Sequence, residues 1–362
     1  MEENFAEQII PGTFIRVQAE GLIAPKGVAF GNVGIVGTAA AAPGVANALG
    51  ATHILSNLDD AKALWAPSDA IAAGTLNLMR SLELLFRNGA STVYTRALAA
   101  GATAQDFADA ADELLKDEIN ILVVPELGTA AATTLLKAAV NSAETNARDV
   151  VGIIGSDLAA NAAPADVVAQ ANADKRLVLA TPAIVGLDPD GSEVVLPGQY
   201  TAAAVAGLIA SLAPQASPTN KTLTGVTRLG RKYGYGELKA LVSGNVLALE
   251  SRQGIRVVRG VTTEGAAFAQ ITTRRIVDYA KAGIRSVSNP FVGRLNNERV
   301  RKALKGALDS FLSTMLVDEQ LTGYTLDVTA TRADEVAGRC VVNVALQPTF
   351  SIDYIRVTLA LS

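Results

Sequence analysis

The sequence of 362 residues has little of the chemistry that most active sites use. It contains one cysteine, Cys340, and one histidine, His53, so neither an internal disulfide nor a metal cluster of His and Cys side chains can be built. A Ser–His–Asp site would have to use His53, and no Gly-x-Ser-x-Gly turn accompanies it. A Walker-type phosphate loop is also absent. The sequence therefore favours a protein that is not an enzyme and needs no cofactor or metal.

Long apolar runs are missing as well. No stretch of about 18 apolar residues is free of charged or turn residues, which argues against membrane insertion. The N-terminus, Met1-Glu2-Glu3, is acidic where a signal peptide is basic, so we expect a protein made in the cytoplasm. Aromatic residues make up 5% and hydrophobic residues 49%, with much alanine, which indicates tight packing of small side chains. Cys340 lies in an apolar stretch and is expected to be buried rather than to act as a nucleophile.

The net charge of −4 is unevenly divided along the chain. Residues 1–220 carry 11 Lys and Arg against 23 Asp and Glu, whereas residues 221–362 carry 20 against 12. The N-terminal part is thus −12 and the C-terminal part +8. This asymmetry suggests that one part faces a charged partner, although two solvated surfaces of opposite sign would give the same totals. The basic part lacks interleaved aromatic residues, so no nucleic-acid partner is expected.

Both ends of the chain show the alternation of a half-buried strand. In residues 351–362, one face holds Ile355, Val357, Leu359 and Leu361, and the other holds Tyr354, Arg356, Thr358 and Ala360. A second alternating segment follows the turn Pro11-Gly12 and includes Phe14, Ile15 and Val17. A terminal strand needs a partner for its backbone groups, which it can find in its own chain or in a neighbour.

Between these ends, strands and helices alternate. Strands are expected at 91–96, 120–124, 150–154 and 176–180, and helices at 57–90, 104–116, 130–143, 165–173 and 201–212. This rhythm predicts an α/β fold with a central, mainly parallel sheet covered by helices.

A glycine-rich stretch raises the question of nucleotide binding. Gly31, Gly34 and Gly37 are spaced three apart rather than as G-x-G-x-x-G, although Asp59 and Asp60 fall in the range where an acidic residue would follow. We therefore favour a strand with close backbone neighbours over a dinucleotide site.

The last part of the chain predicts an α+β unit. After a long connection at 214–236, the pattern indicates a hairpin of 246–250 and 255–259, helices at 266–281 and 297–317, and strands at 324–328, 340–346 and 351–362. The helix at 297–317 separates an apolar stripe from a basic face. That basic face consists of Arg299, Arg301, Lys302 and Lys305.

Several short motifs together resemble one known family. They are Pro11-Gly-Thr-Phe-Ile15, Ser243-Gly-Asn-Val-Leu247, Gly254-Ile-Arg-Val-Val258, Thr272-Thr-Arg-Arg-Ile-Val-Asp-Tyr279, Phe291-Val-Gly-Arg-Leu-Asn-Asn297, Phe311-Leu312 and Leu321-Thr-Gly-Tyr324. In order and spacing they are similar to the contractile tail sheath proteins of bacteriophages and related contractile injection particles. The chain departs from the family where a tryptophan often enters the last long helix, since Val300 and Arg301 stand there.

The resemblance implies a domain organisation. It implies a central α/β domain of subtilisin-like topology without a protease site, an α+β C-terminal domain, and extended terminal strand arms. The expected segments are an N-terminal linking arm at 1–22, an N-terminal domain at 23–100, a central α/β domain at 101–242, a C-terminal sheath domain at 243–350 and a C-terminal linking strand at 351–362.

The resemblance also implies a mechanical function. Hexameric rings of the protein would stack helically around an inner tail tube protein and contract to drive the tube through a target envelope. Other implied partners are baseplate and tail terminator proteins, in a virion tail or injection particle that is assembled in the host bacterial cytoplasm. The arms would link neighbours through Phe14, Ile15, Val17, Tyr354, Ile355, Val357, Leu359 and Leu361, and we expect Arg299, Arg301, Lys302 and Lys305 to face the tube. Two alternatives remain open: an α/β enzyme that binds a nucleotide cofactor, and a static shell or surface-layer protein.

Overall fold

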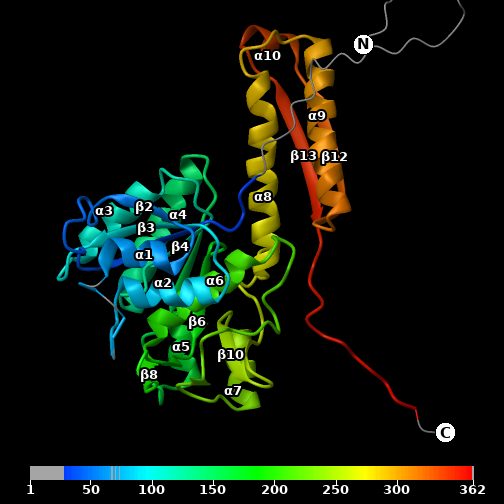
Figure 1. Ribbon diagram of the computed structural model, residues 1–362. Coiled ribbons are helices and arrows are strands. Elements are labelled where there is room, and N and C mark those ends of the chain that lie inside the picture. The colour runs from blue at the N-terminus through cyan, green and yellow to red at the C-terminus, as the bar shows by residue number, and fades with distance from the viewer. Residues whose placement is uncertain (1–27, 67, 70, 73, 361–362) are drawn as a thin grey trace, which may run out of the picture.

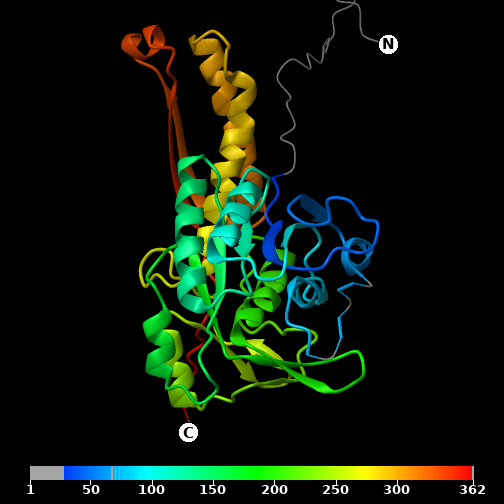
Figure 2. The same ribbon diagram turned by 90° about the vertical axis from the view of Figure 1, so that its left-hand side faces the viewer.

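The computed structural model describes residues 28–66, 68–69, 71–72 and 74–360 (Figure 1). The predicted N-terminal arm with Phe14, Ile15 and Val17 lies outside these residues, as does Leu361. The described chain forms two parts: a body built around a large sheet, and a column of two long helices and a hairpin that stands beside it. We call this column, residues 271–348, the stalk. Figure 2 shows that its helices rise beyond the body.

The body is organised on one sheet of eight strands in the order β11-β10-β6-β5-β4-β1-β3-β2. Its strands are β1 (Val33–Thr38), β2 (Thr52–Leu55), β3 (Val93–Leu98), β4 (Ile121–Val123), β5 (Val151–Gly155), β6 (Leu177–Thr181), β10 (Leu247–Ser251) and β11 (Ile255–Val257). The inner strands pair in parallel, and only β2 and β11 at the edges pair antiparallel. A small antiparallel sheet of β7 (Ile184–Leu187), β8 (Glu193–Leu196) and β9 (Arg228–Leu229) lies at one side. The large sheet crosses both expected domain boundaries, after residues 100 and 242.

Helices cover both faces of the large sheet and create two apolar cores. The body helices are α1 (Leu58–Trp65), α2 (Leu78–Arg87), α3 (Ala104–Leu114), α4 (Thr129–Thr145), α5 (Pro164–Gln170), α6 (Gly198–Ser211) and α7 (Tyr235–Ser243). Helices α2 and α6 pack on one face, and α3, α4 and α7 on the other. Almost every residue of α6 is buried, because alanines and glycines let neighbouring backbones approach closely. A Cβ on Gly207 would collide with the carbonyl oxygen of Leu85 in α2.

The stalk has its own core. Helices α8 (Ile271–Ser288) and α9 (Glu298–Val317), joined through the short helix η1 (Asn289–Phe291), pack against the hairpin of β12 (Leu321–Thr329) and β13 (Val341–Pro348), with α10 (Arg332–Val336) between the two strands. Phe311 of α9 fills the space beside Gly283 of α8, where a Cβ would collide with its ring. Leu304, Leu308 and Met315 are buried, which confirms the predicted apolar stripe of this helix. None of the described helices combines the length and apolar character that crossing a membrane requires.

Several expectations are confirmed and several are wrong. The mainly parallel sheet, the 246–259 hairpin and the strand nature of Gly34 and Gly37 are confirmed. The helical pattern expected at 57–90 forms two helices, α1 and α2. Cys340 is exposed, since it precedes β13 and its side chain lies outside the stalk core. Residues 349–360 have no regular secondary structure in the single chain, so the strand expected at 351–362, for which we favour a partner in a neighbouring subunit, stays a prediction.

Candidate functional site

The carboxyl ends of β1 and β4 mark the place where an α/β enzyme would hold a ligand, since the chain leaves these neighbouring strands in opposite directions along the sheet. Glu126, just after β4, occupies this place. Its carboxylate accepts hydrogen bonds from the backbone N–H and the hydroxyl of Thr38, at 2.7 and 2.6 Å. Burial raises the pKa of Glu126 to about 7, although the two bonds from Thr38 oppose that rise. At this place the carboxylate of Glu126 is thus engaged with Thr38 of β1.

His53 makes only local contacts. It lies on the edge strand β2, where its Nε2 is 2.9 Å from the carbonyl oxygen of Asn47 and its ring packs edge-on against Trp65. Across the part of the chain that the structure describes, no group of three or more His, Cys, Asp or Glu side chains is placed to hold a metal ion. The contacts of His53 in the described chain are therefore those of an edge-strand residue packed on Trp65.

The C-terminal segment, residues 349–360, leaves the base of the stalk and runs away from the protein (Figure 1). Its apolar side chains are exposed: Ile355 by 82%, Val357 by 74% and Leu359 by 85%. Tyr354 is exposed as well, with its ring near the guanidinium of Arg259. The expected linking residues that are described here thus lie free of an apolar core.

The hairpin of the stalk offers unpaired strand edges. Its face toward α8 and α9 carries Tyr324, Leu326, Val342 and Val344, which pack against the helices. The sheet has only two strands, so each of β12 and β13 has an outer edge that no other described strand covers. Such an edge is a template for a strand from another chain.

The basic residues of α9 are less free than the sequence suggested. Arg301 pairs with Glu335 of α10 at 3.0 Å, and this pair is mostly buried. Lys302 pairs with Glu298 on the same helix, and Lys305 lies 3.6 Å from Asp327 of β12. Arg299 is exposed and has no ion pair with any described residue. All four side chains lie on α9, and the ion pair of Arg301 also connects this helix with α10.

A buried group of ion pairs connects the body with α8; we call it the junction. Arg176, at the start of β6, is only 1% exposed. Its guanidinium contacts the carboxylates of Asp149 at 2.7 Å, of Asp278 in α8 at 3.0 Å and of Glu144 in α4 at 3.1 Å. Hydrogen bonds from Arg176 hold the pKa of Glu144 at about 2. The base of the stalk is therefore fixed to the sheet by ion pairs of which Arg176, Asp149 and Asp278 are largely shielded from water, while Glu144 is partly exposed.

Further cations of α8 complete the junction. Lys281 and Arg285 both form ion pairs with Asp149. Arg274 forms an ion pair with Asp278, which lies one turn further along α8. Burial raises the pKa of Asp149, but its hydrogen bonds with Lys281 and Arg285 outweigh this and lower it. Each buried carboxylate of the junction thus has more than one cationic partner, which is how buried charges become tolerable.

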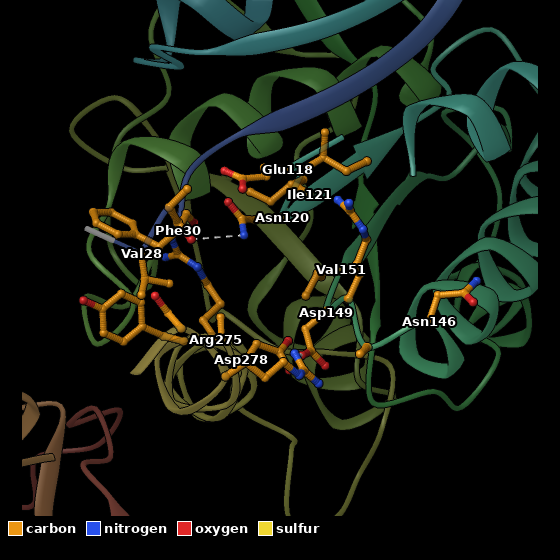
Figure 3. A pocket seen from close by; sticks show the side chains of 18 of the residues that line it. Val28, Phe30, Glu118, Asn120, Ile121, Asn146, Asp149, Val151, Arg275 and Asp278 are labelled. Carbon is orange, nitrogen blue, oxygen red and sulfur yellow. Dashed lines mark hydrogen bonds and ion pairs between the residues drawn. The ribbon is translucent and has the colours of Figure 1, made fainter. Parts of the chain in front are cut away.

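A cavity of about 640 Å³ lies beside the junction, between α8 and the starts of β4 and β5 (Figure 3). Arg275 points toward it from α8 and donates hydrogen bonds to the carbonyl oxygens of Phe30, Leu212 and Ala213, at 3.2, 2.7 and 3.2 Å. Burial lowers the pKa of Arg275 to about 10. Through these bonds one side chain ties the segment before β1, the end of α6 and the stalk together.

Comparison with known proteins identifies the family. Residues 100–263 match the model of the phage tail sheath protein central domain, and residues 263–362 match that of the phage tail sheath C-terminal domain. The chain therefore belongs to the phage tail sheath family. The tail sheath protein of Bacillus phage SP01 is 27% identical over 158 residues, which is 41% of this chain and 28% of that protein.

Solved structures show the same fold over nearly the whole chain. The helical sheath of the anti-feeding prophage (AFP) in its contracted state has a TM-score of 0.75 at 18% identity and covers 97% of this chain and 99% of that one. The contracted PVC sheath complex, from an extracellular contractile injection system, has a TM-score of 0.74 at 16% identity and covers 97% of each chain. The α/β body and the stalk are thus shared architecture.

Sequence reasoning missed the junction. Arg176, Asp149 and Glu144 come from three separate elements, and only the fold brings them together. One signal was present: the expected helix that includes Arg274, Arg275 and Asp278 carries charges on an otherwise buried face. Charged residues are rarely buried unless paired, so such a face indicates partners elsewhere in the chain.

Proposed function

We propose that this chain is the repeating subunit of a contractile sheath, which polymerises as stacked hexameric rings around an inner tube and drives that tube through an envelope when it contracts. Family membership supports the sheath role, and the exposed C-terminal segment carries the proposal. Contraction requires links that stay connected while subunits rotate. A strand at the end of an extended segment suits this because the segment can swing while the strand stays paired.

The structure suggests how such a link forms. Residues 355–362 would lie along an outer edge of the β12–β13 hairpin of a neighbouring subunit and extend its two-stranded sheet. Backbone hydrogen bonds would be gained along the edge, and the side chains of Ile355, Val357 and Leu359 would leave water. Burying each of these side chains contributes about 1.5–3 kcal/mol before the cost of ordering. The N-terminal arm with Phe14, Ile15 and Val17 would add a further strand in the same manner.

Deleting residues 355–362 tests the link. The truncated protein should fold, with an unchanged circular dichroism spectrum. It should sediment as a monomer and form no tubes. Electron microscopy of the purified full chain should show long hollow tubes. Tubes formed by the truncated protein would refute the link, whereas closed or flat lattices of the full chain would favour a static shell.

A matched pair of variants tests which face of the strand is buried. Replacing Ile355, Val357 and Leu359 by serine removes one face, and replacing Arg356 and Thr358 by serine removes most of the other. The first variant should lose polymerisation, and the second should retain it. Equal effects of the two variants would contradict a half-buried strand.

We also propose that the basic face of α9 contacts an acidic inner tube. Arg299, Lys302 and Lys305 are exposed, while Arg301 is engaged with Glu335 and is best left unchanged. Each exposed pair contributes about 0–1 kcal/mol, and repetition along the sheath multiplies the effect.

The test of the tube contact is charge reversal. Changing Arg299, Lys302 and Lys305 to glutamate should prevent assembly on tubes without affecting folding. The control reverses three exposed cations of the body, Lys62, Lys116 and Arg228. Normal assembly on tubes by the α9 variant would place the tube contact elsewhere.

The remaining partners follow from the same role. Baseplate and tail terminator proteins would meet the end rings of the sheath in a virion tail or injection particle assembled in the bacterial cytoplasm. The proposal includes no catalysis, in keeping with the engagement of Glu126 with Thr38 and with the contacts of His53 with Asn47 and Trp65. Replacing His53 by alanine should leave assembly and contraction unchanged, and loss of either in a folded variant would reopen the enzyme alternative.

A further inference from the structure

One carboxylate in the exposed C-terminal segment is buried. The side chain of Asp353 is only 6% exposed, whereas its neighbours Ile352 and Tyr354 are exposed by 81% and 73%. A charged side chain is rarely buried without a partner, and a segment with no regular secondary structure gives no packing reason to bury one. The burial therefore points to a specific attachment.

The attachment is built from two side chains of the connection between the body and the stalk. Arg259 donates from Nε to Oδ2 of Asp353 at 2.7 Å, and Gln270 donates from Nε2 to the same oxygen at 2.9 Å. The backbone N–H of Ser351 donates to the side-chain oxygen of Gln270 at 3.2 Å, and the Ser351 hydroxyl donates to Asp353 Oδ1 at 3.1 Å. Asp353 is thus held by three side chains, one of them charged. We call this group the anchor.

The anchor sits where the stalk begins. Arg259 follows β11 by two residues, and Gln270 caps the N-terminus of α8. The connection between them is itself fixed, since Val261 and Gln270 form a β-bridge and the N–H of Ile271 donates to the carbonyl oxygen of Gly260 at 3.2 Å. A force on the C-terminal segment would therefore reach the base of α8 first, rather than the end of β13.

We propose that Asp353 is a positioning residue that fixes the root of the linking strand to the base of the stalk, so that only residues 355–362 are given to the neighbour. This inference rests on the proposed function, because it presumes that the segment is exchanged. Without the anchor, the free chain would begin after Thr349, whose N–H donates to the carbonyl oxygen of Gln320 at 3.0 Å, and would include 13 residues instead of eight. Its reach would grow from about 27 Å to about 44 Å.

A shorter free segment favours assembly for two reasons. Its end explores a smaller volume, so its effective concentration at the acceptor edge is higher. Its direction is also set before binding, so less freedom is lost when the strand pairs. The anchor further gives contraction a defined pivot between residues 354 and 355. The body and stalk lie on one side of this pivot and the exchanged strand on the other.

The test uses the full-length protein and measures the critical concentration for polymerisation by sedimentation. Asp353→Ala should raise this concentration at least about tenfold, which corresponds to the loss of a charge-assisted hydrogen bond. Asp353→Asn, which keeps an acceptor for Gln270 but loses the charge, should give a smaller increase. The charge-exchanged double variant Asp353→Arg with Arg259→Asp should restore much of the assembly. Glu193→Gln removes an arginine–carboxylate pair from the surface of β8 and serves as the control.

Two further measurements exclude a merely structural role. The urea midpoint of unassembled Asp353→Ala should equal that of the wild type, because the segment adds no core contacts. Hydrogen exchange at residues 351–354 should become as fast as at residues 356–360. The inference is overturned if Asp353→Ala polymerises at the wild-type concentration, or if its urea midpoint falls along with assembly. If the full chain forms closed or flat lattices instead of tubes, the proposed function fails, and if the 355–362 deletion forms tubes, the proposed link fails. If only the Asp353 variants behave as wild type, the anchor alone fails.

Discussion

Replacing Arg176 by methionine should strongly destabilise the protein, because this side chain holds three carboxylates at the junction. Arg176 is almost fully buried and contacts Asp149, Asp278 and Glu144 within about 3 Å. Methionine has a similar length and no charge, so the variant removes the ion pairs while keeping most of the volume. The change therefore isolates the electrostatic part of the contact between body and stalk.

The magnitude follows from what remains after the substitution. Removing one partner of a buried ion pair costs about 3–5 kcal/mol, since the other charge stays buried. Here Asp149 keeps Lys281 and Arg285, and Asp278 keeps Arg274. These remaining cations place the expected loss near the lower end, at about 3 kcal/mol of unfolding free energy.

Urea unfolding of the unassembled protein measures this loss. The single tryptophan, Trp65, is buried in the body, so its emission follows unfolding of the body, while circular dichroism follows body and stalk together. The control is Arg228→Met, which removes a pair with Glu193 in which both side chains are about half exposed, and which should leave the urea midpoint nearly unchanged. If Arg176→Met costs no more than this control, the junction does not stabilise the protein and the reasoning is refuted.

The same junction predicts a dependence on pH. The pKa of Glu144 is about 2 in the folded protein, and that of Asp149 is also lowered. A carboxylate with a lowered pKa contributes its stability above its unfolded pKa of about 4.5, and this is lost as the pH falls toward 2. The loss of stability between pH 5 and pH 2 should therefore be smaller in Arg176→Met than in the wild type.

Three further predictions concern single positions. Gly155→Ala should lower the unfolding free energy by more than about 3 kcal/mol or prevent folding, since its Cβ would collide with the backbone of Gly198. Gly236→Ala in α7, where nothing lies within 4 Å of the new Cβ, should raise the unfolding free energy by up to about 1 kcal/mol, and urea unfolding measures both changes. Glu126 has a pKa of about 7, so its contribution to the stability of the fold is fully present below pH 4.5 and is lost as the pH rises through 7. Glu126→Gln should therefore be about 2–4 kcal/mol more stable than the wild type at pH 8, with no difference at pH 4.5. Cys340 should react with a thiol reagent in the native unassembled protein as fast as in urea, and slow reaction would contradict its exposure.

Periodicity predicted the regular part of the fold because most strands and helices there bury one face within the chain. The apolar stripe of α9 and the parallel strands of the body are such cases. The elements that it missed are short or irregular. Helices α7 and α10 and the strands β7, β8 and β9 have two to nine residues each, which is too few for a clear period. Tertiary contacts decide the structure of such segments.

Side chains that act in pairs were harder to predict. The sequence singled out Arg301 as part of a free basic face, yet it pairs with Glu335 from a helix that periodicity did not predict. Cys340 was expected to be buried on the strength of its apolar neighbours, but it stands just before β13 begins. Asp353 interrupts an apolar alternation, which was the only trace of the anchor in the sequence. For Arg301 and Asp353, the fold brings a partner that lies far away in the sequence.

The C-terminal segment has the sequence pattern of a strand but no partner strand in the described chain. Its alternation is that of a strand with one buried face, yet Ile355, Val357 and Leu359 are exposed and no described strand pairs with their backbone. Leaving three large apolar side chains in water together with an unpaired backbone forgoes several kcal/mol that a partner could recover. The root of the segment is already held by Arg259 and Gln270, at the start of the stalk. The hairpin of the stalk has open edges, but a segment fixed at Asp353 points away from its own hairpin (Figure 1). We therefore expect the surface that completes this strand to belong to another copy of the chain, as the proposed link between subunits requires.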